Sequence, residues 1–416
     1  MVRFAHMADV HLGAWRYPEL SQLNLESFKK AMDECIKEKV DFIIIAGDLF
    51  DIAMPSVEIL KDAVTEFKKL NDANIPCYIV AGSHDYSLTG RTFIDVLEKA
   101  GFCKNVASLE QKGNDLCLNF IPENKTLAIF AGIPGKKTGI ELEYFKKLKV
   151  DKEQLEKYKD FLKIFVFHTA ITESKPKNAI MDSICIKDLP DGFDYYAAGH
   201  LHVQDIHYKN KTPVVYPGPI FPNNTEELEK LEQGSFVIAD FNEKTKQIKI
   251  EEKFIKFQEV MPLEINVDNL PVEEANSKIQ QKLENTNFKD KILILKISGH
   301  LSSGKTSDID FEKIKEKTKN AFFLLKNTSK LTTKEIDLEI NTSNSTIETI
   351  EGDFIKKYET QIPEEFKKFS EFSLPLIANL DFEKKEEEKK DDFKARVFET
   401  VNKILKLNLK NEDQKD

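Results

Sequence analysis

Residues 42–51 read FIIIAGDLFD, and the fold class depends on this stretch. The apolar run at 42–45 is typical of a β-strand buried on both faces, as strands are in parallel α/β sheets. Two small residues and then Asp48 follow this run. Ligands of α/β sheets bind beyond the carboxyl ends of the strands, so Asp48 stands where a functional carboxylate is expected. Taken alone, Asp48 is more simply explained as a cap for the next turn, and the other strand ends must decide.

Length, composition and charge limit the possible functions. The chain has 416 residues, which is too many for one compact core and predicts two or three domains. The formal net charge of −10 does not favour nucleic-acid binding. Only four residues are arginine: Arg3, Arg16, Arg91 and Arg396. If DNA binds, we expect lysines on one face to contact phosphates, not arginines to read bases.

Three sequence features bear on the cellular setting. No apolar run approaches the roughly 18 residues of a membrane span. The N-terminus lacks the apolar segment of a signal peptide. The five cysteines are scattered and form no CxxC motif, which is typical of reduced thiols. We therefore expect a cytoplasmic protein that is not secreted and has no membrane partner.

The order of predicted elements indicates three segments. Strands and helices alternate up to about residue 100, which indicates an α/β arrangement, and shorter strands, expected to be more antiparallel, continue to residue 255. Residues 256–335 have the pattern of a small α+β domain. Residues 336–416 contain a polar linker and helical stripes, one of which includes Phe393, Val397, Val401 and Ile404. Such a stripe shows only that one face of a helix is buried, either against a partner or against its own chain.

Aspartates and histidines gather directly after the predicted strands. A single buried histidine is more often a satisfied core residue than a ligand, but several strands ending in this way point to a shared site. The residues are Asp9, His11, Asp48, His84, Asp85, His168, His200 and His202.

This mixture of side chains suits a two-metal phosphoesterase. Two divalent ions about 3.5–4 Å apart can hold the attacking and leaving oxygens of an in-line displacement and activate a water molecule. Such a pair needs a bridging carboxylate together with imidazole ligands, a set that favours Mn²⁺, Fe²⁺ or Zn²⁺ over Ca²⁺.

The motifs DxH, GDLFD, GxHD, H and GHLH, in this order, resemble the calcineurin-like metallophosphoesterase superfamily. More narrowly, residues 4–13 (FAHMADVHLG) and 46–51 (AGDLFD) resemble the Mre-eleven/SbcD type of DNA repair nuclease, of the archaeal kind. The resemblance covers about residues 1–255. It implies an α/β core built as a two-sheet β-sandwich flanked by helices, followed by a capping domain at 256–335 and C-terminal helices.

The resemblance also implies a role for each motif residue. Two Mn²⁺ ions would be bound, with Asp48 bridging them. The ligands of one ion would be Asp9, His11, Asp48 and His202, and those of the other Asp48, Ser83, His168 and His200. His84 would stabilise the transition state or protonate the leaving oxygen, and Asp85 would orient His84.

Two positions depart from the family pattern. Ser83 stands where the family usually has Asn, and its shorter, neutral hydroxyl is expected to weaken the second metal site. Asp51 stands where many archaeal and eukaryotic relatives have His, as in bacterial-like members, which leaves His84 as the candidate acid.

Outside the metal motifs, the resemblance implies three kinds of contact. Substrate would contact Lys136, Lys137 and Tyr216, although a solvated surface position explains the lysines equally well. A homodimer would form through a four-helix bundle that includes Leu60, Val64, Phe93 and Leu97. Phe393, Val397, Val401 and Ile404 would bind the coiled coil of an ABC-type ATPase of the Rad-fifty/SbcC type, giving a heterotetramer at the nucleoid.

Three functional hypotheses remain open from the sequence. The first is a Mn²⁺-dependent DNA exonuclease and endonuclease of double-strand-break repair, acting on double-stranded DNA ends. The second is a stand-alone phosphatase or cyclic-nucleotide phosphodiesterase, against which the long extension beyond residue 255 argues. The third is a DNA-end-binding scaffold with catalysis weakened at Ser83.

Overall fold

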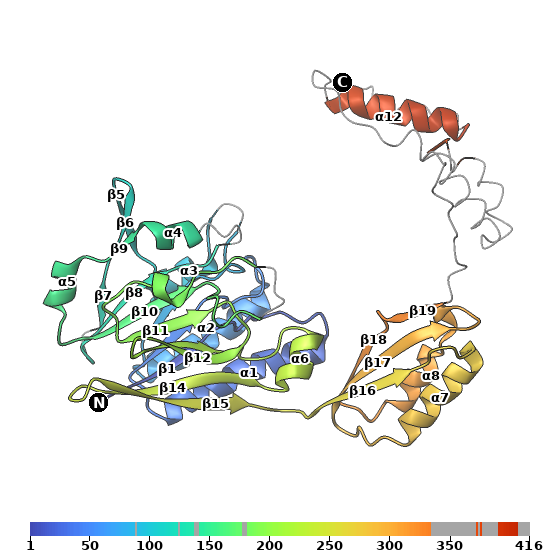
Figure 1. The fold of residues 1–416 in the computed structure, drawn as a ribbon, viewed down its shortest axis with the longest axis horizontal. Helices are drawn as coiled ribbons and strands as arrows, with labels where there is room; N and C mark the ends of the chain where they lie inside the picture. Colours follow the sequence, from blue (N-terminus) through green and yellow to red (C-terminus); the bar gives the residue numbers. More distant parts are fainter. Residues whose placement is uncertain are drawn as a thin grey trace. The chain divides into compact units, whose positions relative to one another are not determined.

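The computed structural model describes residues 1–87, 90–123, 125–136, 141–176, 181–333, 372, 375–376 and 390–406. The chain divides into two units, residues 1–333 and residues 334–416, which we describe separately. The first unit contains two six-stranded sheets, a four-stranded sheet and a three-stranded sheet (Figure 1). The boundary expected at residue 335 lies two residues from this division, whereas the one expected at residue 255 lies inside the first unit.

The first sheet has the strand formed by residues 42–46 near its centre. In spatial order its strands are β15 (Gln247–Ile255), β14 (Gly234–Asn242), β1 (Val2–Met7), β2 (Phe42–Ala46), β3 (Cys77–Val80) and β4 (Lys104–Asn105). Strands β1 to β4 are parallel to one another, and β14 pairs antiparallel with β1. The carboxyl ends of β1, β2 and β3 therefore meet at one edge.

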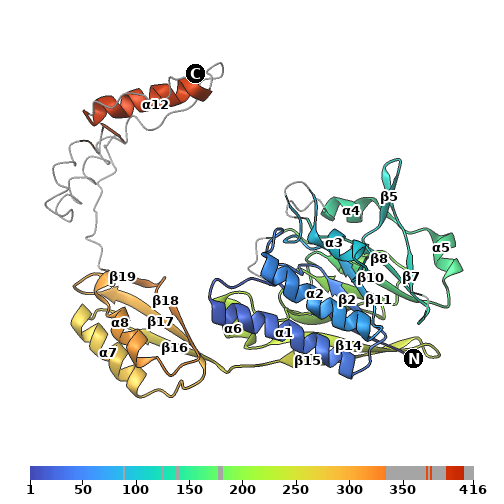
Figure 2. The ribbon, with the colours of Figure 1, turned by 180° about the vertical axis from the view of Figure 1, so that it is seen from behind.

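Strand β2 alternates between two apolar layers, because successive side chains of a strand point to opposite faces. Ile43 and Ile45 pack against the helices that cover the sheet, and Phe42 and Ile44 face the second sheet. The covering helices are α1 (Pro18–Lys37), α2 (Val57–Asp72) and α3 (Phe93–Lys99). Figure 2 shows α1 and α2 running along this outer face.

The second sheet faces the first across the layer that contains Phe42. In spatial order its strands are β12 (Gln204–Lys209), β13 (Thr212–Pro217), β11 (Tyr195–Gly199), β10 (Leu162–His168), β8 (Ala128–Ile133) and β7 (Ile121–Glu123). The sequence predicted a more antiparallel set, but the four inner strands are parallel and only the edge strands are antiparallel. The reason is that long connections return the chain to the same end of the sheet after β8 and β10.

The outer face of the second sheet is covered by short elements. They are β5 (Leu109–Lys112), β6 (Asp115–Leu118), α4 (Glu141–Lys147), β9 (Leu148–Lys149), α5 (Lys152–Lys157) and a 3₁₀ turn, η1 (Ile186–Asp188). Phe145 of α4 packs edge-on against Phe165 and Phe167 of β10. This packing fixes the strand that ends in His168.

Residues 256–333 form a smaller layered structure, which we call the capping subdomain. Its strands β16 (Val260–Asn266), β17 (Ile292–Leu301), β18 (Phe323–Asn327) and β19 (Leu331–Thr333) are all parallel. One face packs against α7 (Val272–Glu284), η2 (Thr306–Asp308) and α8 (Phe311–Lys317). The other face contributes to an apolar cluster shared with α1 and α6 (Thr225–Leu231).

The second unit contains one long described helix, α12 (Lys390–Ile404). The side chains of Phe393, Val397, Val401 and Ile404 are half-buried, and Phe398 is exposed. Among the helices of the described residues, none has the length and apolar character needed to cross a membrane.

Candidate metal centre

The centre lies at the carboxyl ends of five parallel strands, three from the first sheet and two from the second. Strand β1 leads to Asp9 and His11, β2 to Asp48, β3 to His84, β10 ends in His168, and β11 leads to His200 and His202. The backbone of four of these residues is left-handed: φ is +52° at Asp9, +48° at His11, +50° at Asp48 and +92° at His200. Non-glycine residues rarely adopt this conformation, and where they do it is often at a functional site.

Two glycines allow the strand ends to approach one another. Gly47 has φ +90°, and a Cβ there would lie 2.2 Å from Nδ1 of His168. A Cβ on Gly82 would lie 2.2 Å from Oδ1 of Asp48. The Gly-Asp and Gly-Ser-His-Asp motifs therefore need glycine because a neighbouring ligand occupies the space of a side chain.

Asp48 is the centre of the cluster. Its Oδ2 lies 3.0 Å from Nε2 of His168 and 3.6 Å from Nε2 of His11. Its Oδ1 accepts a hydrogen bond of 2.7 Å from the backbone N–H of His84. The carboxylate thus faces histidines from both sheets, which is the position that a bridging ligand requires.

Asp9 occupies a second position between the sheets. Its Oδ1 lies 3.7 Å from Nε2 of His202 and 3.9 Å from Nδ1 of His168. The backbone N–H of His200 donates to both oxygens of Asp9, at 3.1 and 3.2 Å. The His200 ring lies edge-on to the His168 ring, with centroids 5.1 Å apart.

Hydrogen bonds donated by Nδ1 fix the orientation of three of the rings. Nδ1 of His168 donates to the Ala46 carbonyl oxygen at 2.8 Å, Nδ1 of His11 lies 3.3 Å from Oδ1 of Asp51, and Nδ1 of His202 lies 2.9 Å from Oε1 of Glu227. Metal-binding histidines are normally held in this way.

The opposite ring nitrogens provide a test of whether a metal fits. Nε2 of His11 is buried and makes no hydrogen bond to any described residue, and Nε2 of His168 is buried and lies 3.0 Å from Oδ2 of Asp48. Three groups place their candidate ligand atoms within 4.8 Å of one another: Asp9, His11 and His202; His11, Asp48 and His84; Asp9, Asp48 and His168. Buried imidazole nitrogens beside carboxylates are the donor set of a divalent metal, so the residues fit such an ion.

Carboxylates raise the pKa of two histidines in the metal-free protein. Burial lowers the pKa of His168, but Asp48 outweighs it and raises that pKa to about 10. Burial also lowers the pKa of His202, but Glu227 outweighs it and raises the pKa to about 9. Burial lowers the pKa of His200 to about 4. A bound metal would replace the protons on His168 and His202, so metal affinity should rise with pH.

Asp85 makes different contacts from those expected. Its carboxylate accepts hydrogen bonds from the backbone N–H groups of Leu49, Phe50 and Gly82, and the His84 Nδ1 instead lies 2.6 Å from the carbonyl oxygen of Asp51. Burial, followed by the Asp48 charge, raises the pKa of Asp85 to about 7. Asp85 therefore fixes the loops after β2 and β3, and it does not orient the His84 ring as the sequence suggested.

Tyr216 is also placed differently from the expectation of a substrate contact. It is fully buried, its hydroxyl donates to the Thr169 carbonyl oxygen at 2.6 Å, and it accepts from the Ile171 N–H at 3.0 Å. Because the side chain is fully buried, substrate cannot reach it. Tyr216 instead holds the loop after His168.

Of the remaining expected substrate and ligand residues, Lys136 and Ser83 lie in loops beside the centre. A Cβ on Gly135 would lie 2.6 Å from Cδ2 of His168, and Lys136 follows this glycine with Nζ 3.5 Å from the centroid of the Tyr86 ring. Ser83 lies half-buried in the loop before His84. Lys137 lies outside the described residues.

The expected dimer residues separate into two groups. Leu97 is 2% exposed and belongs to the apolar core between the first sheet and its helices, so it cannot contact a second copy. Leu60, Val64 and Phe93 are half-buried against the same core. The more exposed apolar residues in this region are Ile52, Met54, Val57 and Val96.

Sequence reasoning missed Glu227, the partner of His202. It lies 25 positions further along the chain, and an acidic residue in the first turn of a helix is common for reasons of capping alone. No local signal in the sequence could connect it with the metal centre.

A fold of two facing sheets with aspartates and histidines at the strand ends defines a metallophosphoesterase. Consistent with this class, the calcineurin-like phosphoesterase family profile matches residues 2–204. The DNA double-strand break repair protein Mre11 of Methanocaldococcus jannaschii is 30% identical over 284 residues, which cover 67% of this chain and 73% of that protein. The chain belongs to the Mre11 family.

Other comparisons are shorter or more distant. Mre11 of Archaeoglobus fulgidus is 30% identical over 242 residues, 55% of this chain and 52% of that protein. The match spans only about half the length of several of these relatives, 52–56% in three cases. A dimetal phosphatase structure from Danio rerio covers 62% of this chain and 99% of its own at 11% identity, with a TM-score of 0.38 that is too low to add to the assignment.

Proposed function

We propose that the chain is a Mn²⁺-dependent nuclease subunit of DNA double-strand-break repair that hydrolyses phosphodiester bonds with two metal ions. The observation that carries the proposal is the position of Asp48, whose carboxylate lies within 3.0 Å of His168 and 3.6 Å of His11. When bound, two divalent ions supply positive charge for the attacking and leaving oxygens and activate water.

The residues divide into two sets around Asp48. Asp9, His11 and His202 would hold one ion. His168 and His200 would hold the other, with Ser83 as a weak or water-completed ligand. The edge-on contact of the His168 and His200 rings supports their assignment to the same ion.

His84 is suited to act on the leaving oxygen. Its side chain is 46% exposed, whereas that of His11 is 3% exposed. Its Nδ1–H donates to the Asp51 carbonyl oxygen at 2.6 Å, which leaves Nε2 directed away from that loop. Because Nδ1 keeps its proton, Nε2 can donate one only from the imidazolium form.

Duplex DNA ends are the proposed substrate, and a coiled-coil ABC-type ATPase is the proposed partner. Lys136 follows Gly135, where a Cβ would lie 2.6 Å from Cδ2 of His168, and this position supports a phosphate contact beside the centre. The exposed apolar residues on and before α2 and α3 support a homodimer, and the stripe on α12 supports ATPase binding. Such a complex would work on DNA in the cytoplasm, at the nucleoid.

One assay separates this function from two others. The unmodified protein should degrade double-stranded DNA in Mn²⁺, more strongly with a cognate ATPase, and an Asp48→Asn variant should not. Strong turnover of a small phosphodiester without DNA cleavage would instead indicate a stand-alone phosphodiesterase. DNA-end binding without turnover of either substrate would indicate a scaffold, which Ser83 makes the second candidate.

A further inference from the structure

Helix α6 lies between the metal centre and the capping subdomain. It has seven residues, Thr225–Leu231, and follows the loop in which Phe221 and Pro222 pack against α1 and Trp15. Three consecutive residues of this helix, 227 to 229, contact two different parts of the first unit. The first contacts a candidate metal ligand, and the other two contact the capping subdomain.

Glu227 is held tightly at both carboxylate oxygens. Oε1 accepts from Nδ1 of His202 at 2.9 Å and from the side-chain amide of Asn224 at 2.6 Å. Oε2 accepts from the backbone N–H of Asn223 at 2.9 Å. The Glu227 N–H in turn donates to Oδ1 of Asn224, the N-cap residue, at 2.9 Å. The orientation of the His202 ring is therefore tied to the first turn of α6.

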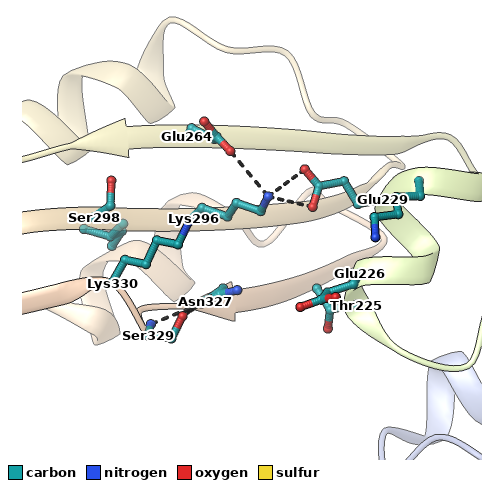
Figure 3. Close-up of a pocket in the computed structure, with 11 residues that line it drawn as sticks. Thr225, Glu226, Glu229, Glu264, Lys296, Ser298, Asn327, Ser329 and Lys330 are labelled. Atoms are coloured by element: carbon teal, nitrogen blue, oxygen red, sulfur yellow. Dashed lines mark hydrogen bonds and ion pairs between the residues drawn. The ribbon is translucent and has the colours of Figure 1, made fainter. Parts of the chain in front are cut away.

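The next two residues bind α6 to the capping sheet. Leu228 is 1% exposed and packs in the cluster that contains Val260, Ile292 and Ile294. The carboxylate of Glu229 accepts a hydrogen bond of 2.6 Å from Nζ of Lys296 in β17. The same Nζ lies 3.3 Å from Oε1 of Glu264 in β16 (Figure 3).

We propose that α6 couples the capping subdomain to the metal centre, with Glu227 as the positioning residue for His202. A helix of about two turns, fixed at its first turn to His202 and along its next residues to the capping sheet, transmits a displacement of one to the other. The proposal rests on the metal centre described above, but it does not depend on DNA as the substrate. A ligand ring that shifts by even a fraction of an ångström loses its preferred geometry.

Coupling of this kind is reciprocal. If the contacts of the capping subdomain improve metal binding, then a bound metal must strengthen those contacts by the same free energy. Two measurements on the DNA-free protein therefore test the proposal: the affinity for Mn²⁺, and amide hydrogen exchange in α6 and β17.

The first variant is Glu227→Ala. It should lower the affinity for one of the two Mn²⁺ ions by about 10- to 100-fold, the usual effect of losing a residue that orients a metal-binding histidine. Glu227→Gln should recover most of this loss, because its amide oxygen still accepts from Nδ1. The His202 Nδ1 proton, observed by NMR in the metal-free protein, should exchange faster with water in Glu227→Ala.

The second variant is Lys296→Met, with Lys317→Met as the matched control. Lys317 pairs with Glu284 inside the capping subdomain, and its side chain is 28% exposed against 27% for Lys296. Lys296→Met should lower the affinity for the same ion by about fivefold, at the lower end of coupling energies. It should also remove the protection that Mn²⁺ gives to amides of β17, whereas Lys317→Met should change neither.

The outcomes are distinguishable from failure of the proposed function. Unchanged Mn²⁺ affinity in a folded Glu227→Ala protein would overturn the positioning role. Equal effects of Lys296→Met and Lys317→Met would overturn the coupling. A protein that shows the expected metal effects but leaves DNA intact would contradict the nuclease function alone.

Discussion

His84 differs from the other histidines of the centre because its side chain is half exposed. It lies close enough to His11 and Asp48 to be grouped with them as a possible ligand, yet its Nδ1 is fixed by Asp51. The two roles, ligand and proton donor, differ in what their loss would do to metal content.

We expect His84→Gln to lower DNA cleavage by at least about 100-fold, the usual contribution of a general acid, while two Mn²⁺ ions remain bound. The glutamine keeps a polar side chain of similar size but cannot supply the proton. Steady-state cleavage and metal content after dialysis, measured on the same preparation, check the assignment. Loss of metal in parallel with activity would show that His84 is a ligand.

His6 is a buried histidine outside the metal centre. Its Nδ1 lies 3.1 Å from the Tyr195 hydroxyl, and burial lowers its pKa to about 3. Because the pKa in the unfolded chain is near 6.5, the unfolded state takes up a proton first as the pH falls. The stability that neutral His6 provides is complete above pH 6.5 and is lost between pH 6.5 and about 3.

This predicts an acid-dependent loss of about 2 kcal/mol at pH 5 relative to pH 8 from this residue alone. His6→Gln removes the titrating group, so the variant should lose less stability than the unmodified protein on acidification, whatever its stability at pH 8. Urea unfolding at both pH values measures the difference. Equal losses in the two proteins would show that His6 does not titrate in this way.

The candidate ligands carry a local signal in the sequence, and the residues that support them do not. Asp9, Asp48 and His168 each follow an apolar run, so their place at a strand end is visible locally. Glu227, Asp85 and Tyr216 act through hydrogen bonds to residues distant in the chain or to backbone groups. Such roles depend on tertiary distances, which a strand-end pattern does not contain.

Among the helices, the exposed apolar residues near α2 and α3 form the surface on which we propose that a second copy would bind. Val57 is 76% exposed and Val96 57% exposed, whereas Leu97 is in the core. The resemblance named Leu97 as an interface residue, but the spacing in a seven-residue helix does not reveal that Leu97 is in the core and Val96 is exposed.

We expect Val57→Asp and Val96→Asp to weaken a homodimer by at least about tenfold each, because a buried valine contributes roughly 1.5 kcal/mol or more. Sedimentation equilibrium measures the shift towards monomer. Leu127, which is 49% exposed on a turn elsewhere, provides the control through Leu127→Asp. A dimer that tolerates both valine substitutions would place the interface elsewhere.

The second sheet shows the limit of reading strands one at a time. Its short strands were recognised, but their parallel order depends on how the connections after β8 and β10 return. These connections contain short helices and polar stretches whose path no periodicity specifies. The wrong prediction of strand direction did not change the expected location of the site, because each candidate ligand follows its own strand.

At the scale of the whole molecule, α12 belongs to a unit separate from the metal centre. Its half-buried stripe contains Val397 and Val401. Phe398 lies about 100° around the helix from Val397. A partner helix that packs on the stripe would leave Phe398 outside the contact.

We expect Val397→Asp with Val401→Asp to reduce binding to the coiled coil of the cognate ATPase by at least about tenfold. Phe398→Asp should have little effect and serves as the matched control. Isothermal titration with the isolated coiled coil provides the measurement. Equal loss from all three positions would indicate unfolding of α12 and not a binding face.

The two facing sheets were expected from the family resemblance, and the structure confirms them. The metal site at the strand ends and the role of the capping segment stay predictions, although the motif residues and apolar patterns behind them were visible in the sequence. The contacts that unite the core and the capping subdomain were not, since Lys296 and Glu229 are 67 positions apart.

Anomalous diffraction from a Mn²⁺-soaked crystal tests the central claim most directly. Two peaks are expected on opposite sides of Asp48, one beside Asp9, His11 and His202 and the other beside His168 and His200, the second weaker because of Ser83. Two peaks of equal occupancy would show that Ser83 is no handicap. A single peak, or none at Asp48, would contradict the two-metal centre.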